Sequence, residues 1–182
     1  MALSIIAAGQ SANQLAEIDW AVVQLAQFKH DENYHREISR LPMQDRLRHM
    51  VPHFAKYVGR MQEAHDQAVF RQIAVDVLII ALSCANILNI DLCKTSLVPG
   101  QQPMTRAEFV RLVAISAGRM AAACEKLDHL EDFPFRPALA EEALAILRAS
   151  LALCAAEGWD PIVEMQQRLL PIKRKSIFHG SL

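Results

Sequence analysis

Glycine and aromatic residues are scarce in this 182-residue chain. It holds 6 Gly, and aromatic residues make up 6% of the sequence. Neither a glycine-rich phosphate loop nor a G-x-S-x-G motif occurs along it. These absences exclude the sequence signatures of P-loop nucleotide binding and of α/β-hydrolase chemistry.

The chain also has no surplus of one charge. Its 19 Lys and Arg stand against 20 Asp and Glu, for a formal net charge of −1. Nucleic-acid binding through bulk positive charge is therefore excluded, and we expect no nucleic-acid partner. Hydrophobic residues make up 52%, which is enough for one domain or for two small ones packed together. We treat residues 1–182 as a single domain.

Long apolar runs and paired cysteine motifs are missing as well. The most apolar stretch, 75–90, is interrupted by Asp76, Ser83 and Asn86, and its unbroken part is only Val77–Leu82. This pattern predicts a buried helix and no membrane span. The N-terminus lacks the basic segment of a signal peptide, so we expect a cytoplasmic protein with reduced, mostly buried thiols. These thiols are Cys84, Cys93, Cys124 and Cys154.

Alanine, leucine and helical periodicity dominate the chain, which predicts an all-α fold. The expected helices cover 12–29, 43–66, 68–89, 105–127, 138–157 and a short segment from 161 to about 171. The polar sequence of 30–42 is interpreted as a connection. The apolar stripe of the first expected helix is Leu15, Ile18, Val22, Leu25 and Ala26.

Local signals mark several helix ends. Pro52 predicts a kink or a restart inside the second helix, because proline removes an amide donor. Thr105 and Glu108 have the spacing of a capping box. Gly158 is suited to a left-handed cap, and Asp160-Pro161 has the pattern of a helix start.

Two segments of the chain correspond to each other. "HFAKYVGRMQEA" aligns with "LVAISAGRMAAA" when Gly59 is placed on Gly118, and "NILNIDL" aligns with "AAEGWDP" when Asp91 is placed on Asp160. This predicts two helical hairpins, 43–90 and 105–157, that form a four-helix bundle about a pseudo-twofold axis. An extra N-terminal helix and a short C-terminal helix complete it. The alternative is a chance similarity of two amphipathic hairpins.

The repeat unit resembles the MazG-type all-α nucleoside triphosphate pyrophosphohydrolase family over about residues 46–175. "KYVGRM" stands where the family has "EEVGEL", and "VDVL" and "NIDL" stand at its "ADVL" and "GIDL". The tail 158–175 is similar to the family's C-terminal pattern. The resemblance implies Mg²⁺-dependent hydrolysis between the α- and β-phosphates of a nucleotide. Hard Mg²⁺ is held there by oxygen ligands of an ExxE on one helix and an ExxD on the next.

Most positions of this metal motif no longer hold a carboxylate. The ExxE positions are Tyr57 and Arg60 in the first unit and Ser116 and Arg119 in the second. The ExxD positions are Ile73 and Asp76, then Glu142 and Ala145, with Glu141 beside Glu142. The residual metal candidates are therefore Asp76, Glu141 and Glu142. A guanidinium group cannot coordinate Mg²⁺, but it can neutralise these carboxylates.

Each other candidate has two interpretations. Asp76 is either a residual ligand or, as we favour, the partner of Arg60 or Arg119, because a lone buried carboxylate is costly. His49 and His53 have metal-ligand spacing, but surface histidines are favoured. His30, His35 and the acidic residues of "HDENYHRE" either bind a metal or, as we favour, lie in a solvated loop. The ExxD strings at 63–66 and 125–128 are either relocated carboxylates or, as we favour, solvated helix ends.

The resemblance implies a MazG-like relative with an eroded Mg²⁺ site that is weakly active or inactive. Its ligand would be a nucleoside triphosphate, and Mg²⁺ its cofactor where activity remains. The alternative is a helical protein-interaction or oligomerisation module without enzymatic activity. Broad apolar stripes, on the first helix and at 73–88, predict a homo-oligomer.

Overall fold

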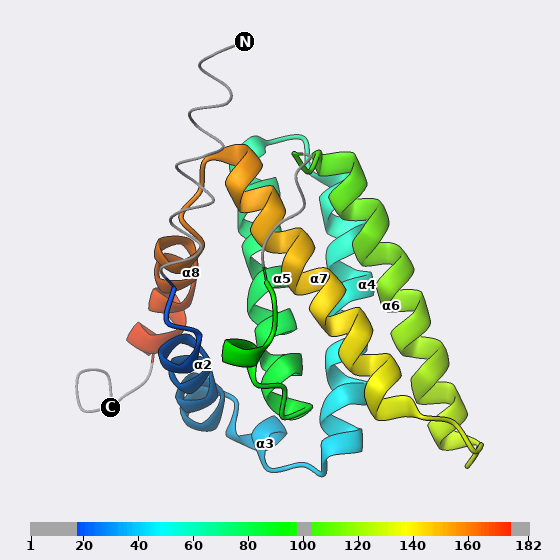
Figure 1. The fold of residues 1–182 in the computed structure, drawn as a ribbon. Coiled ribbons are helices and arrows are strands. Elements are labelled where there is room, and N and C mark those ends of the chain that lie inside the picture. The colour runs from blue at the N-terminus through cyan, green and yellow to red at the C-terminus, as the bar shows by residue number, and fades with distance from the viewer. Residues whose placement is uncertain (1–17, 98–102, 176–182) are drawn as a thin grey trace.

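The structure, a computed structural model, describes residues 18–97 and 103–175, where all regular elements are helical and no strand occurs. Its centre consists of α4 (Met43–Glu63), α5 (Gln67–Ile87), α6 (Arg106–Asp128) and α7 (Phe135–Glu157). Figure 1 shows them side by side, with α4 against α5 and α6, and with α7 against the same two helices. The predicted all-α bundle is confirmed.

The core lies on the axis of this four-helix bundle. Each helix contributes side chains that are almost fully buried, and burying one such side chain stabilises the fold by about 1.5–3 kcal/mol. The largest are Phe54 on α4, Leu82 on α5, Phe109 on α6 and Ile146 on α7. The apolar periodicity that predicted these helices therefore also marks their inward faces.

The apolar helix α5 is long enough to cross a membrane, with a mean hydropathy of 1.9 in its most apolar window. Two observations place it inside the bundle: 67% of that window is buried, and α5 contacts α4, α7, α2 and α8. A buried core helix has this composition because it has no solvent-facing side.

Four shorter elements lie outside the bundle: α2 (Trp20–Tyr34), α3 (Arg36–Ser39), the 3-10 turn η1 (Leu92–Lys94) and α8 (Pro161–Lys175). Both α2 and α8 pack on α5 (Figure 1). The prediction that 30–42 is only a polar connection was wrong, because α2 extends to Tyr34 and α3 follows it. The part of the expected helix before residue 18 lies outside the described residues.

Helix α2 buries its polar side and exposes its apolar side. Val22 is 60% and Leu25 53% exposed, whereas Gln27 is 2% and His30 4% exposed. The predicted apolar stripe is therefore not the packed face of this helix. The reason lies in α5, which presents polar side chains to α2.

A seam of hydrogen bonds joins α2 to α5 and to the chain that follows it. Gln24 Nε2 donates to Asn86 Oδ1 at 3.0 Å and to the Ile90 carbonyl at 2.8 Å, and Asn86 Nδ2 donates to the Gln24 carbonyl at 3.0 Å. The Leu92 amide donates to Gln24 Oε1 at 3.1 Å. Each bond contributes about 1 kcal/mol net, so the seam positions α2 together with the apolar contacts that Trp20 and Val23 make with the core.

Both internal prolines are tolerated. Helix α4 runs through Pro52 and α8 runs through Pro171, so the restart alternative at Pro52 is excluded and the expected end near Pro171 was wrong. A proline removes one hydrogen bond, and the buried neighbours Val51 and Phe54 anchor α4 on both sides of it.

The predicted caps are present. Thr105 and Glu108 form the reciprocal capping box of α6. Asp160 Oδ1 accepts hydrogen bonds from the amides of Ile162 at 2.9 Å and Val163 at 3.0 Å, at the start of α8. These contacts satisfy amides that the first helical turn leaves unpaired.

The helices α5 and α7 end in the same local structure. Asn89 has φ 56° and Gly158 has φ 70°, both left-handed. One residue later, the Ile90 and Trp159 amides each donate to a carbonyl five residues earlier, both at 2.9 Å. This is the bond of a Schellman cap. Asn89 and Gly158 are aligned with each other when Asp91 is placed on Asp160.

Gly158→Ala should lower the free energy of unfolding by about 1–2 kcal/mol, because a Cβ is strained at positive φ. A steric clash does not contribute to this loss, since a methyl group at this position would have no atom within 4 Å. Urea unfolding followed by circular dichroism measures the change.

Gly59→Ala is the matched control. It also adds a methyl group into open space, but within a helix, so it should raise the free energy of unfolding by about 0.5–1 kcal/mol. Equal effects of the two substitutions would contradict the left-handed cap at Gly158.

Candidate functional site

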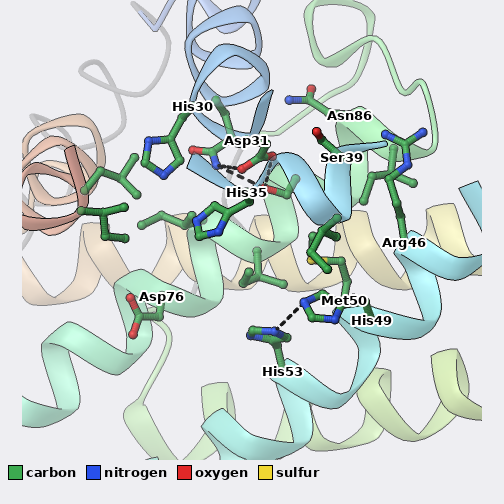
Figure 2. A pocket seen from close by; sticks show the side chains of 18 of the residues that line it. His30, Asp31, His35, Ser39, Arg46, His49, Met50, His53, Asp76 and Asn86 are labelled. Carbon is green, nitrogen blue, oxygen red and sulfur yellow. Dashed lines mark hydrogen bonds between the residues drawn. The ribbon is translucent and has the colours of Figure 1, made fainter. Parts of the chain in front are cut away.

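A cavity of about 680 Å³ lies where α2, α3, α4, α5 and α8 meet (Figure 2). Its volume is within the range of small-molecule sites. The wall is mixed: aliphatic side chains such as Ile79 and Ile80 alternate with histidines, carboxylates and cations. This cavity is called the α2–α5 cavity below.

Asp76, the predicted residual metal ligand, lines the α2–α5 cavity and is bound by Arg168 of α8. Arg168 Nε donates to Asp76 Oδ1 at 2.7 Å, and its Nη2 donates to Oδ2 at 2.9 Å. The predicted ion pair exists, but the predicted partners Arg60 and Arg119 were wrong. The reason is tertiary, because α8 packs on α5 and brings a guanidinium group from 92 residues away.

Tyr57 and Arg60, which the sequence resemblance aligned with the ExxE positions, line the same cavity. Tyr57 is buried, and burial together with the negative charge of Asp76 raises the pKa of its hydroxyl to about 12. It is therefore a neutral phenol near pH 7. Under the resemblance stated above, a phenol and a guanidinium group would stand at the two ExxE positions.

The second unit has its own ion pair. Arg119 Nη1 lies 3.1 Å from Glu142 Oε1, and Ser116 is buried beside them on α6. Glu141 is exposed, and neither glutamate lines the α2–α5 cavity. Within residues 18–97 and 103–175 no group of three or more His, Cys, Asp or Glu side chains is suited to hold a metal ion. A metal role for Asp76, Glu141 and Glu142 stays a prediction.

Two histidines of α4 form a linked pair in the cavity (Figure 2). His53 Nε2 lies 3.3 Å from His49 Nε2, and Lys56 Nζ lies 3.2 Å from His53 Nδ1. An ammonium group only donates, so Nδ1 accepts and Nε2 carries the proton. Burial, and then the charges of Lys56 and His49, lower the pKa of His53 to about 4.

His30 lies on α2 and is buried, so its assignment to a solvated loop was wrong. Its side chain is 4% exposed, and neither ring nitrogen has a hydrogen-bond partner among the described residues. Burial, followed by the nearby His35 and Lys173, lowers its pKa to about 4. His30 is thus a neutral imidazole with one unused donor and one unused acceptor.

Asp31 belongs to the acidic residues of "HDENYHRE" that were assigned to a solvated loop, and this assignment was wrong, because its side chain makes hydrogen bonds to buried neighbours. Its Oδ2 accepts a hydrogen bond from Ser83 Oγ at 2.8 Å and its Oδ1 accepts one from Gln27 Nε2 at 2.9 Å, and burial raises its pKa. A signal for it exists, since Gln24, Gln27 and Asp31 form a polar stripe at helical spacing. A polar stripe on one helix facing Ser83 on an apolar helix indicates a buried polar contact.

The α2–α5 cavity carries a positive surplus. Five cationic side chains against three carboxylates leave two positive charges, and the lowered pKa values keep His30 and His53 neutral. The cations are Arg46, Lys56, Arg60, Arg168 and Lys175, and the carboxylates are Asp31, Glu32 and Asp76. This charge balance is suited to an anionic ligand.

No protein-family model, no curated protein and no solved structure matches the chain. Function is therefore inferred from the residues of the cavity.

The free energy of unfolding should fall as the pH drops from about 6.5 toward 4. The folded-state pKa of His30 lies below the unfolded value of 6.5, so the unfolded chain takes up the proton first. His30 alone should account for up to about 3 kcal/mol of this loss. Urea unfolding at stepped pH measures the slope.

His30→Asn should flatten that slope, whatever it does to stability at neutral pH. His129→Asn, at an exposed position outside the cavity, serves as the control variant. A His30→Asn slope equal to that of the unmodified protein would exclude His30 as its source.

Proposed function

We propose that the α2–α5 cavity binds a phosphate-bearing nucleotide, and that the chain is a relative of the MazG-type pyrophosphohydrolases without Mg²⁺-dependent hydrolysis. The observation that carries this proposal is the bidentate bond between Arg168 and Asp76. Through this bond, the Arg168 guanidinium group occupies both oxygens of Asp76. In this proposal, Asp76 is the one carboxylate that the first unit retains from the metal motif.

The charges in the cavity support phosphate binding without a metal. Lys56 and Arg60 project from α4, and Lys175 lies on the last turn of α8; all three line the cavity. Guanidinium and ammonium groups bind phosphate oxygens through charge-assisted hydrogen bonds. They supply the positive charge that Mg²⁺ would otherwise contribute.

The proposal includes an internal duplication of the helical hairpin. The burial of α4 and α6 matches at the predicted spacing, with Phe54 and Val113 buried, and Met61 and Met120 buried. A duplicated hairpin explains why one unit keeps a ligand-binding cavity while Arg119 and Glu142 neutralise each other in the second.

The protein should bind nucleoside triphosphates in magnesium-free buffer and release no pyrophosphate when Mg²⁺ or Mn²⁺ is added. Isothermal titration calorimetry with ATP, GTP, CTP and UTP measures the binding, and a phosphate-release assay with pyrophosphatase measures the turnover. Arg60→Ala and Lys56→Ala should each raise the Kd about tenfold, because each removes a charged phosphate contact.

Arg111→Ala is the control, since this exposed arginine on α6 does not line the cavity. It should change Kd by less than about twofold, because screening weakens distant surface charges. The proposal fails if no nucleotide binds, and its inactive-site part fails if metal-dependent turnover is robust.

A second function, self-association, is favoured by the exposed apolar side of α2. Val22 is 60%, Leu25 53% and Phe28 49% exposed, at successive intervals of three residues on one helix. Grouped apolar side chains on a surface are typical of protein interaction sites. They are suited to an oligomer contact, as the helical-module alternative requires.

Light scattering at micromolar concentration should give a mass of at least a dimer. Leu25→Glu should shift the mass toward the monomer, because a buried unpaired carboxylate opposes the contact. Val69→Glu, which places the same charge at an exposed apolar position on α5, is the control. A monomeric mass for the unmodified protein would rule out this function.

A further inference from the structure

We infer that Asp31 selects the base of the bound nucleotide and that the cavity prefers guanine. The inference rests on the proposed nucleotide site and concerns its opposite end. In Figure 2, Asp31 lies on the α2 side of the cavity, while Asp76 and His53 lie on the α5 and α4 side.

Asp31 is a carboxylate with spare hydrogen-bonding capacity. Ser83 and Gln27 each donate one hydrogen bond to it, and both donors are neutral. No cation forms an ion pair with Asp31 among the residues that the structure describes. Two carboxylate oxygens have about four lone-pair positions, so two remain for a ligand.

Gln27 adds another unused acceptor beside this carboxylate. Its side-chain nitrogen is used, donating to Asp31 Oδ1 at 2.9 Å and to Ser83 Oγ at 3.2 Å. Its Oε1 is buried and has no partner within the described ranges, although the residue is only 2% exposed. Because this oxygen has almost no exposed surface, the contacts to a ligand are assigned to Asp31, which lines the cavity.

The donor pattern of the bases then distinguishes them. The guanine edge presents two adjacent donors, N1–H and the N2 amino group. Adenine and cytosine place an amino donor next to a ring-nitrogen acceptor, and uracil places N3–H between two carbonyl acceptors. An acceptor facing a carboxylate is repelled, so only guanine pairs with both oxygens of Asp31.

The electrostatics of Asp31 agree with this assignment. Burial raises its pKa, because its charge has lost contact with water. Two N–H donors from a base would stabilise the ionised form in place of that water. A phosphate at this end would instead meet the same charge, so the phosphates belong beside Lys56 and Arg60.

Calorimetry with the four nucleoside triphosphates should show GTP binding at least about tenfold tighter than ATP, CTP or UTP. Asp31→Asn should weaken GTP binding about tenfold or more, because the amide presents a donor to a donor. It should strengthen binding of ATP, CTP and UTP, because the amide donor pairs with the acceptor that lies beside the donor of each of these bases. The same variant should gain affinity for xanthosine triphosphate, whose base has a carbonyl where guanine has its amino group.

Glu32→Gln, which removes a neighbouring cavity carboxylate, is the control and should keep the preference for GTP. Equal binding of all four nucleotides overturns the guanine assignment and leaves the nucleotide site standing. Binding of none overturns both. A uniform loss for all four in Asp31→Asn, with a lowered melting temperature, shows a structural role and also overturns the assignment.

Discussion

The hydrogen bond from Ser83 to Asp31 is the contact on which the orientation of α2 depends. Ser83 lies in the most apolar helix of the protein and is 1% exposed. Its hydroxyl needs a partner, and the partner is a carboxylate on α2 at 2.8 Å. Because α5 presents polar groups on this face, the helix that covers it must bury polar groups too. Helix α2 is therefore turned with its apolar side outward.

The cavity follows from this polar packing. An apolar interface would close into dense contact, as it does between α4, α5, α6 and α7. The α2–α5 interface is instead held at particular positions by Gln24, Gln27 and Asn86, and space remains beside it. A cavity whose polar groups are partly unsatisfied is costly for an unliganded fold. A ligand that supplies the missing donors would recover that free energy.

At the other end of the cavity, Arg168 has the same effect on Asp76 that a metal ion would have. It compensates a half-buried carboxylate with positive charge and fills both oxygens. In the second predicted hairpin, Arg119 makes a single contact with one oxygen of Glu142. Charge compensation by arginine keeps these carboxylates tolerable in the fold. It also leaves no converging set of oxygen ligands for Mg²⁺ in the described part of the chain.

Local sequence determined the helices of the bundle and many of their ends. The capping box at Thr105, the left-handed cap at Gly158 and the start at Asp160 need only neighbouring residues, so short patterns were sufficient to predict them. Apolar side chains at helical spacing also form the buried faces around Phe54 and Ile146, the same pattern from which the helices were predicted. Tyr57, Arg60 and Asp76 were selected from the sequence, and they do line one cavity.

Only the tertiary structure decided which partners these residues have. Arg168 reaches Asp76 across 92 residues, and Ser83 reaches Asp31 across 52 residues, so no local pattern contains either pair. The orientation of α2 was also beyond periodicity, because an apolar stripe predicts a buried face only when the neighbouring surface is apolar. The sequence determines which side chains a helix offers on each face. Which face becomes the interior depends on the free energy of the whole packed arrangement.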